Sequence, residues 1–191
     1  METIRFRVTI LVPMSLLCLL LSTIVYGAEH KTAEEYYVDG KAAYQKGLYE
    51  EAISAFTKAI KLNPKLGDVY FARGSAYANR NQPDLAISDL TQAIKLNPLN
   101  ENIYTSRGAA YAMKGSNDQA FSDFNQALKL NPKDGLAYAS RAVTYCQKGE
   151  YDKAWEDVNK ARVNGYWVPQ EFIKGLEESS GRSEYEINKT P

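Results

Sequence analysis

Apolar residues recur with helical spacing through most of this 191-residue chain. Ala52, Phe56 and Ala59 are separated by four and three residues, which places them on one face of a helix. Tyr36 and Gly40 show the same four-residue step before them. This segment therefore predicts two consecutive amphipathic helices.

The two-helix pattern returns every 34 residues. The sequence Ala-Ile-Lys-Leu-Asn-Pro ends at Pro64 and again at Pro98, and Ala-Leu-Lys-Leu-Asn-Pro ends at Pro132. Numbering each unit so that this proline is position 32 predicts four repeats, which span residues 33–66, 67–100, 101–134 and 135–168.

Several columns of the repeat hold residues of constant size. Position 8 is glycine or alanine, positions 20 and 27 are alanine, and position 24 is apolar in every unit. Tyrosine occupies position 4 in all four units and position 11 in three. Small residues let two helix backbones approach closely, so we expect the large residues, including these tyrosines, to fill the core beside them.

Residues that favour helix ends stand between the predicted helices. Position 15 is occupied by Gly47, Asn81, Gly115 and Gly149. Glycine and asparagine tolerate the left-handed conformation that ends a helix. The Asn-Pro pair at positions 31 and 32 ends the second helix, because a residue before proline avoids helical angles.

With a large residue at position 4, small residues at 8, 20 and 27 and proline at 32, residues 33–168 resemble the tetratricopeptide repeat (TPR) family. The resemblance implies an all-α fold, a right-handed superhelical solenoid of four helix-turn-helix units. It also implies a concave groove, lined by the first helix of each unit, in which extended or helical peptides bind.

Positions 2, 5, 9, 12 and 13 of the first helix point away from its packed face, and we call them the groove positions. We predict that a partner contacts Tyr37, Lys41, Tyr44, Phe71, Ser75, Asn79, Thr105, Ala109, Met113, Ala139, Val143 and Cys146. The groove is aromatic at one end and small and apolar at the other. Such a surface suits an apolar segment of a protein or peptide partner.

Other occupants of the groove stay open at this point: the capping helix, the N-terminal tail, or a second copy of the chain in a homo-oligomer. Some TPR domains hold the acidic tails of chaperones with a clamp of Lys, Asn and Arg. Repeats 1–3 place Tyr37, Lys41, Ala72, Asn102 and Ser106 at the clamp positions, so the clamp is absent.

Two charged columns indicate a link between the helices of one unit. Position 7 is Arg73, Arg107 and Arg141, and position 23 is Asp89, Asp123 and Asp157. Repeat 1 has Asp39 and Ala55 instead, so it lacks both partners together. We therefore predict an Arg–Asp pair within each of repeats 2–4; two independent, solvated columns are the alternative.

The fourth repeat departs from the pattern, with Tyr166 in place of the proline. Terminal repeats are commonly atypical, because one side has no neighbour. Residues 169–178 begin with proline and carry Phe172, Ile173 and Leu176, which predicts a capping helix. Residues 179–191 are polar and predict a disordered tail.

The first 27 residues differ from the rest of the chain. Arg5 and Arg7 precede an uncharged, apolar stretch at residues 8–28. This pattern predicts a secretory signal peptide at residues 1–27 and a short linker at residues 28–32. The alternative is an uncleaved membrane tether through residues 8–26. We expect an exported protein, periplasmic or secreted, or else a membrane-anchored one.

Composition narrows the class of partner. The chain has 23 basic and 23 acidic residues, and this balance argues against a nucleic-acid partner. His30 is the only histidine, no group of side chains has metal-ligand spacing, and no serine has an activating base. We therefore expect no metal, no cofactor, no small-molecule substrate and no enzymatic activity.

The predicted function is protein–protein interaction, as an adaptor or assembly scaffold. A membrane-anchored scaffold and an accessory subunit of an envelope or secretion enzyme complex are the alternatives.

Overall fold

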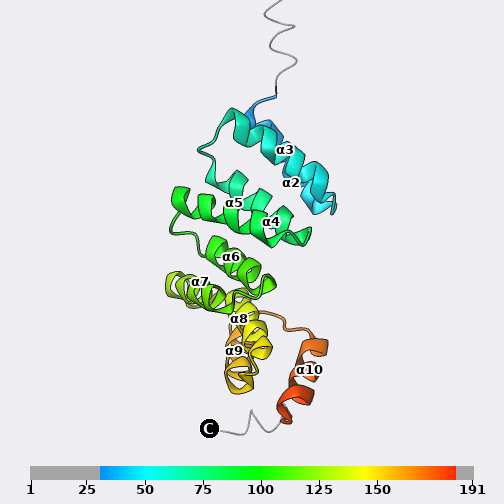
Figure 1. Ribbon diagram of the computed structural model, residues 1–191, viewed down its shortest axis with the longest axis vertical. Helices are drawn as coiled ribbons and strands as arrows, with labels where there is room; N and C mark the ends of the chain where they lie inside the picture. The colour runs from blue at the N-terminus through cyan, green and yellow to red at the C-terminus, as the bar shows by residue number, and fades with distance from the viewer. Residues whose placement is uncertain (1–30, 184–191) are drawn as a thin grey trace, which may run out of the picture.

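The computed structural model describes residues 31–183, and residues 1–30 and 184–191 lie outside the described part. The described part forms nine helices and no strand (Figure 1). The helices are α2 (Ala33–Gln45), α3 (Tyr49–Leu62), α4 (Gly67–Asn79), α5 (Pro83–Leu96), α6 (Glu101–Met113), α7 (Asn117–Leu130), α8 (Gly135–Gln147), α9 (Tyr151–Val163) and α10 (Gln170–Ser180). The predicted signal peptide and the end of the predicted tail fall outside these residues.

Successive helices form pairs, and the pairs stack along the long axis of the molecule (Figure 1). α2 packs on α3, α4 on α5, α6 on α7 and α8 on α9, and the second helix of each pair packs on the first helix of the next. Each pair thus buries its outer face only against a neighbouring pair. The predicted all-α repeat solenoid is confirmed.

Glycine at position 8 sets the separation of the two helices in a unit. A Cβ atom on Gly108 would lie 2.7 Å from Cε1 of Phe124, closer than carbon atoms approach one another. The aromatic ring at position 24 therefore occupies the space that a side chain at position 8 would need. Repeat 4 combines Ala142 with the smaller Val158, and both are fully buried.

The interface between units uses a wider stripe of the first helix than we predicted. Val69 and Ile103 at position 3, and Ala76 and Ala110 at position 10, are at most 1% exposed. The tyrosines at positions 4 and 11 are only half-buried. Six of the seven pack against the buried clusters, so they border the core as its outer layer instead of filling it. The first helix lies between its own partner and the second helix of the preceding unit, which moves these tyrosines to the edge of the buried stripe.

The first helices end at left-handed residues, as predicted. The backbone angle φ is 75° at Gly47, 56° at Asn81, 77° at Gly115 and 73° at Gly149. In repeat 1 the N–H of Gly47 donates to the carbonyl of Tyr44, and the N–H of Leu48 donates to the carbonyl of Ala43. This Schellman arrangement satisfies carbonyls that the end of the helix leaves free.

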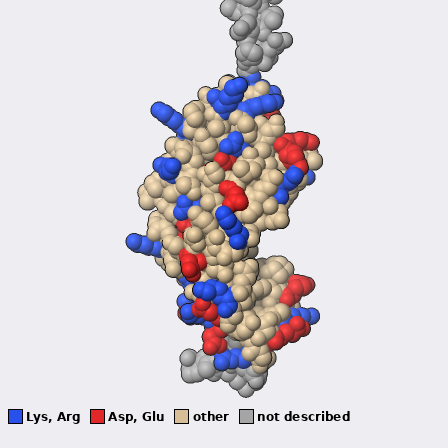
Figure 2. All heavy atoms as spheres, viewed as in Figure 1, with Lys and Arg blue, Asp and Glu red and all other residues tan. Residues whose placement is uncertain are grey.

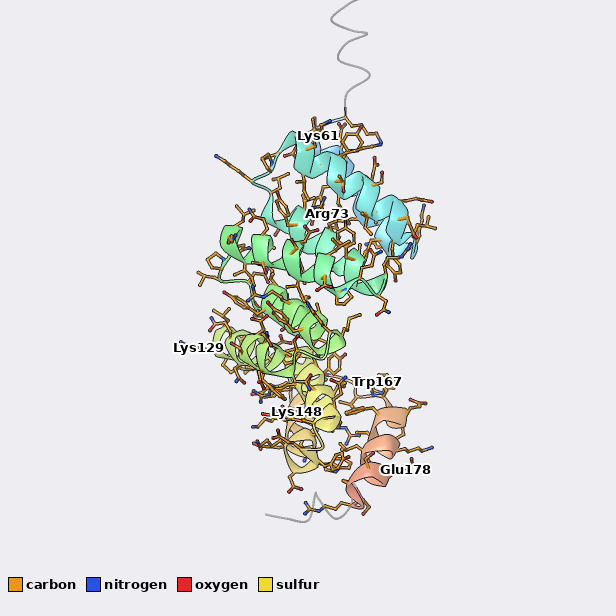
Figure 3. The ribbon with its side chains drawn as sticks, viewed as in Figure 1. Lys61, Arg73, Lys129, Lys148, Trp167 and Glu178 are labelled. Carbon is orange, nitrogen blue, oxygen red and sulfur yellow. The ribbon has the colours of Figure 1, made fainter. Side chains whose placement is uncertain are left out.

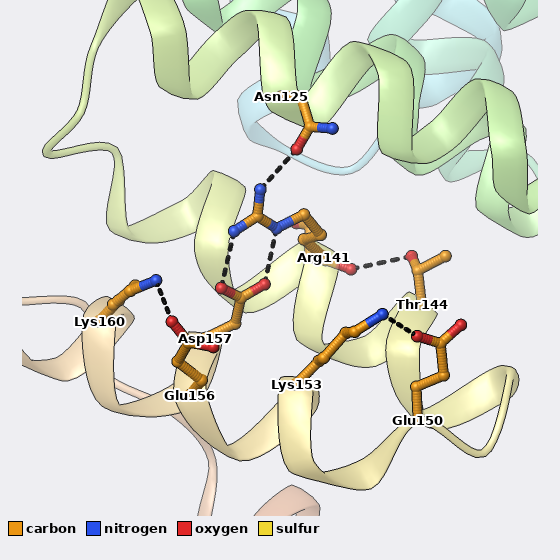
Figure 4. A network of polar contacts seen from close by, with 9 residues as sticks. Asn125, Arg141, Thr144, Glu150, Lys153, Glu156, Asp157 and Lys160 are labelled. Carbon is orange, nitrogen blue, oxygen red and sulfur yellow. Dashed lines mark hydrogen bonds and ion pairs between the residues drawn. The ribbon is translucent and has the colours of Figure 1, made fainter.

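The predicted Arg–Asp pairs are present in repeats 2–4. Nε of Arg141 donates to Oδ2 of Asp157 at 2.7 Å, and Nη2 donates to Oδ1 at 2.8 Å (Figure 4). The same two bonds join the corresponding residues of repeats 2 and 3. All three aspartates are buried, so each pair is a two-pronged, charge-assisted contact rather than a solvated one.

The same guanidinium groups reach the preceding unit. Nη1 of Arg73 donates to Oγ1 of Thr57 at 2.9 Å, and Nη1 of Arg107 donates to Oγ1 of Thr91 at 3.1 Å. Nη1 of Arg141 donates to Oδ1 of Asn125 at 2.6 Å. The three acceptors all occupy position 25, a polar column that the sequence alone did not connect with position 7. Each arginine thus links the second helices of two neighbouring units.

Helix α10 covers the end of the fourth unit. Its Ile173 and Leu176 are buried in one apolar cluster with Trp155 of α9. Nε1 of Trp155 also donates to Oγ of Ser180 at 3.3 Å, in the last turn of α10. The helix ends two residues later than the predicted capping helix, because these contacts give its last turn a surface to pack on.

Replacing Gly108 by alanine is expected to destabilise the protein by about 1–3 kcal/mol, because the new methyl group overlaps Phe124. Gly175 in α10 is a matched control, since nothing lies within 4 Å of a Cβ there. Alanine at Gly175 is expected to stabilise by up to about 1 kcal/mol through helix propensity.

Urea unfolding followed by circular dichroism measures both changes. Adding Phe124→Val to Gly108→Ala reproduces the pairing of repeat 4, so the double variant should lose less stability than the sum of the single variants. Equal effects of alanine at Gly108 and Gly175 would contradict the proposed packing.

Two neighbouring acidic residues on α9 allow a buried ion pair to be compared with an exposed one. Asp157→Asn is expected to cost about 1.5–3 kcal/mol, because Arg141 keeps its charge without its carboxylate partner. Glu156 pairs with Lys160 on the exposed surface (Figure 4), and Glu156→Gln is expected to cost at most about 0.5 kcal/mol. The free energy of unfolding in urea tests both, and similar losses would show that the Arg–Asp pair adds nothing beyond a surface contact.

Candidate functional site

The predicted groove residues lie on the first helices of the four units. α2 carries Tyr37, Lys41 and Tyr44; α4 carries Phe71, Ser75 and Asn79; α6 carries Thr105, Ala109 and Met113; α8 carries Ala139, Val143 and Cys146. Figure 2 shows the outline of the molecule hollowed at the level of α6, between α4 and α10.

A pocket of about 350 Å³ lies between α2 and α4. It is lined by Tyr37, Lys41, Tyr44, Gln45, Phe56, Phe71, Ala72 and Ser75. Five of these eight are residues that we predicted to contact a partner. The structure therefore brings the aromatic end of the predicted groove together into one concave site.

Gln45 lies at groove position 13, whereas the other two lining residues, Phe56 and Ala72, were not predicted to line the groove. Phe56 was assigned only to the core, at position 24. It is fully buried, and its ring centroid lies 6.0 Å from that of Tyr37, so it closes the inner side of the pocket. The combination of a glycine at position 8 with an aromatic residue at position 24 recurs in the third unit, so it did not mark Phe56 as a pocket residue.

Aromatic and hydrogen-bond contacts hold the walls of the pocket. The rings of Tyr44 and Tyr49 meet edge to face with centroids 5.5 Å apart. Nδ2 of Asn79 donates to Oη of Tyr44 at 2.8 Å and to the carbonyl of Ser75 at 2.9 Å. Because Tyr44 accepts this bond, its own hydroxyl hydrogen stays available to an acceptor in the pocket.

Burial raises the pKa values of both tyrosines in the walls. The nearby Asp68 carboxylate raises the pKa of Tyr37 further. For Tyr44, Tyr49 adds to the increase, whereas the bond from Asn79 opposes it. Both phenols therefore remain protonated donors at neutral pH.

Lys41 supplies the positive charge of the pocket. It is exposed, and its Nζ lies 5.4 Å from the ring centroid of Tyr37. It is the only basic residue at the groove positions of α2, α4, α6 and α8, and it forms no ion pair within residues 31–183. The remaining charges at groove positions are Glu34 and Asp68.

The other half of the groove is apolar and uncharged. Met113, Leu136 and Val143 are 47%, 44% and 41% exposed, which is high for large apolar side chains. Trp167 is 74% exposed and lies in the segment just before α10 (Figure 3). Met113, Leu136 and Val143 occupy groove positions beyond the aromatic pocket.

Thr105 does not belong to the accessible surface. It is 2% exposed, and its hydroxyl donates to Oδ2 of Asp134 at 2.9 Å. The prediction that it contacts a partner was therefore wrong. Position 5 lies at the edge of the buried stripe, and Thr105 is covered there because it bonds to Asp134, whereas Tyr37, Phe71 and Ala139 at the same position are only half-buried.

The described residues hold no group of histidine, cysteine, aspartate or glutamate side chains arranged to bind a metal. Across residues 31–183, the helices also lack one with the length and apolar character needed to cross a membrane. The concave pocket is thus the feature that calls for a functional explanation.

Tetratricopeptide repeat models match three stretches of the chain, at residues 40–81, 71–134 and 124–156. The crystal structure of YrrB, described as a TPR protein with an unusual peptide-binding site, is 30% identical with a TM-score of 0.62. The match covers 70% of this chain and 69% of YrrB. The chain belongs to the TPR family. No curated protein matches this TPR chain.

Further solved TPR structures are similar to this TPR protein. The crystal structure of MamA is 27% identical with a TM-score of 0.66, over 74% of this chain and 83% of MamA. The first TPR of Spaghetti (RPAP3), bound to the HSP90 peptide SRMEEVD, is 26% identical with a TM-score of 0.59. That match covers 61% of this chain and 93% of the RPAP3 domain.

Alkylation of Cys146 is expected to be slow near neutral pH. Burial raises the pKa of its thiol, so a smaller fraction is the reactive thiolate than in an exposed cysteine. Iodoacetamide labelling of a Cys18→Ser variant, before and after unfolding in urea, measures the difference. The folded chain should also need a higher pH for half-maximal labelling, and equal rates in both states would contradict this placement of Cys146.

Proposed function

We propose that this TPR protein is a non-catalytic adaptor or assembly scaffold that binds a segment of a partner protein along its concave groove. The observation that carries the proposal is the pocket between α2 and α4. It has an aromatic wall, a cation and free hydroxyl donors, and its walls are held in place by contacts within the fold. A concave apolar site with a few convergent polar groups is the usual form of a binding site.

The uncharged half of the groove supports the same proposal. Monomeric proteins seldom expose several large apolar side chains on one surface unless that surface binds something. Met113, Leu136 and Val143 extend the contact surface from the pocket toward α10. A segment that occupied the whole groove would therefore meet aromatic anchors at one end and flexible, apolar contacts at the other.

Similar structures support a peptide as the ligand. YrrB is described as having a peptide-binding site, and the RPAP3 domain is bound to a peptide. The chaperone peptide held by RPAP3 is acidic at its end, and this chain lacks the Lys-Asn-Arg clamp for such tails. We therefore propose a different peptide class for this groove.

We also propose export of the chain, by cleavage of residues 1–27 or with residues 8–26 retained as a tether. The support is the uncharged stretch of residues 8–28 after Arg5 and Arg7. In either case the repeats would bind their partner outside the cytoplasm. If residues 8–26 are retained, the protein would be a membrane-anchored scaffold.

Tyr37→Ala and Phe71→Ala are each expected to weaken peptide capture about tenfold or more, because buried aromatic anchors dominate binding energy. The measurement is fluorescence anisotropy with peptides selected from a displayed random library on the full chain. Leu99→Ala is the control, since Leu99 is 76% exposed and lies outside the groove positions. Undiminished binding by the double variant, with helical content intact, would exclude the aromatic pocket as the binding site.

A further inference from the structure

The charges around the aromatic pocket are arranged unevenly. Lys41 lies one helical turn after Tyr37 on α2, whereas Asp68 lies at the first turn of α4 and acts on the phenol of Tyr37. Lys41 is at groove position 9 of the first unit and Asp68 is at groove position 2 of the second. A difference of seven helical positions corresponds to about 10 Å along a helix axis. An incoming segment therefore meets a positive charge on one side of the pocket and a negative charge on the other.

Two of the polar groups that line the pocket, Lys41 and Tyr44, have hydrogen-bond donors available to a ligand, whereas the amide of Gln45 can donate or accept. Nζ of Lys41 has no ion-pair partner within the described residues, and Tyr44 keeps its hydroxyl hydrogen free because it accepts a bond from Asn79. Ser75 already donates to the carbonyl of Phe71 at 2.9 Å. No carboxylate lines the pocket. The rim next to Lys41 therefore matches an acceptor with negative charge.

The inner surface of the pocket is apolar. Phe56, Phe71 and Ala72 offer no side-chain polar atom, so a polar group placed against them would lose its hydrogen bonds to water. A large apolar side chain suits this part. The same ligand must thus combine an apolar group inside with a carboxylate at the rim.

We propose that the pocket binds an internal peptide motif that consists of a large apolar residue and a nearby aspartate or glutamate. The apolar side chain enters the pocket, and the acidic side chain lies next to Lys41. This proposal rests on the proposed function and specifies its ligand. Charge complementarity commits the site to this occupant. A chain-terminal carboxylate fits less well, because this chain lacks the Lys-Asn-Arg clamp with which other TPR domains hold acidic tails.

A displayed library of random peptides, flanked on both sides by Gly-Ser so that no free terminus is presented, tests the motif on the full chain. The wild-type protein should enrich leucine, isoleucine, methionine or phenylalanine with a nearby acid. Lys41→Glu should keep the apolar preference and enrich lysine or arginine in place of the acid. Lys61→Gln, at the far end of α3 from the pocket (Figure 3), is the control and should leave the selection unchanged.

Synthetic peptides then assign the carboxylate to its partner. Replacing the peptide's acid by its amide should weaken binding to the wild-type chain about two- to fivefold, the range for an exposed ion pair, and should not weaken binding to Lys41→Gln. Equal weakening in both proteins, or selected peptides without an acid, would overturn the motif.

The outcomes also separate this inference from the proposed function. If Phe71→Ala abolishes capture but no acid preference exists, the motif fails and groove binding stands. If Phe71→Ala leaves capture intact, or if no peptide is enriched, groove binding fails and the motif with it. Analytical ultracentrifugation of the full chain tests for self-association. If the chain self-associates and both Phe71→Ala and Lys41→Glu abolish the association, the pocket binds a second copy and the motif is overturned.

Discussion

The close approach of two helices at position 8 is the constraint on which the rest of this structure depends. The missing side chain of Gly40 or Gly108 leaves room for the ring at position 24, and that ring packs directly against the glycine. In the first unit the same geometry has a second consequence. Phe56 packs over Gly40 and also forms the inner side of the pocket, so the contact that holds the unit together also shapes the pocket. A change at either residue would therefore alter stability and recognition together.

Arginine at position 7 turns a row of two-helix units into one connected body. Each guanidinium binds an aspartate in its own unit and a hydroxyl or amide in the preceding one, so a unit cannot tilt without breaking charge-assisted bonds. The first unit has no such arginine. Beside the apolar packing of Val69 on α3, its polar links to the second unit are the bond of Arg73 to Thr57, the bond of Asn79 to Tyr44 and the ion pair of Arg80 with Glu50. The aromatic pocket lies at this same junction. Its shape is thus set before a ligand arrives, which lowers the entropic cost of binding.

The sequence predicted those features that depend on spacing within one unit. Helix pairs, left-handed residues such as Gly47 and the Arg–Asp columns all follow from the period of 34 residues and from elementary helix geometry. It failed where a residue meets two neighbours at once. The helical pattern gave α6 one packed face, so Thr105 was placed on the open side, although Asp134 at the end of the same unit covers it. Phe56 was assigned to the core alone for the same reason, since the pocket beside it exists only when α4 stacks on the first unit.

Packing and recognition use different positions of the repeat, and this separation explains how a regular scaffold can bind selectively. Positions 8, 20, 24 and 27 hold similar residues in every unit, because each unit must satisfy the same contacts. Positions 9 and 12 face outward, and they change freely along the chain, from Lys41 and Tyr44 in the first unit to Val143 and Cys146 in the fourth. A partner segment bound along the groove would therefore contact an aromatic, charged site at one end and an uncharged, mostly apolar surface at the other. Because the backbone repeats and the groove side chains do not, a segment bound as proposed would have one favourable register and direction, and the charged pocket at one end would set both.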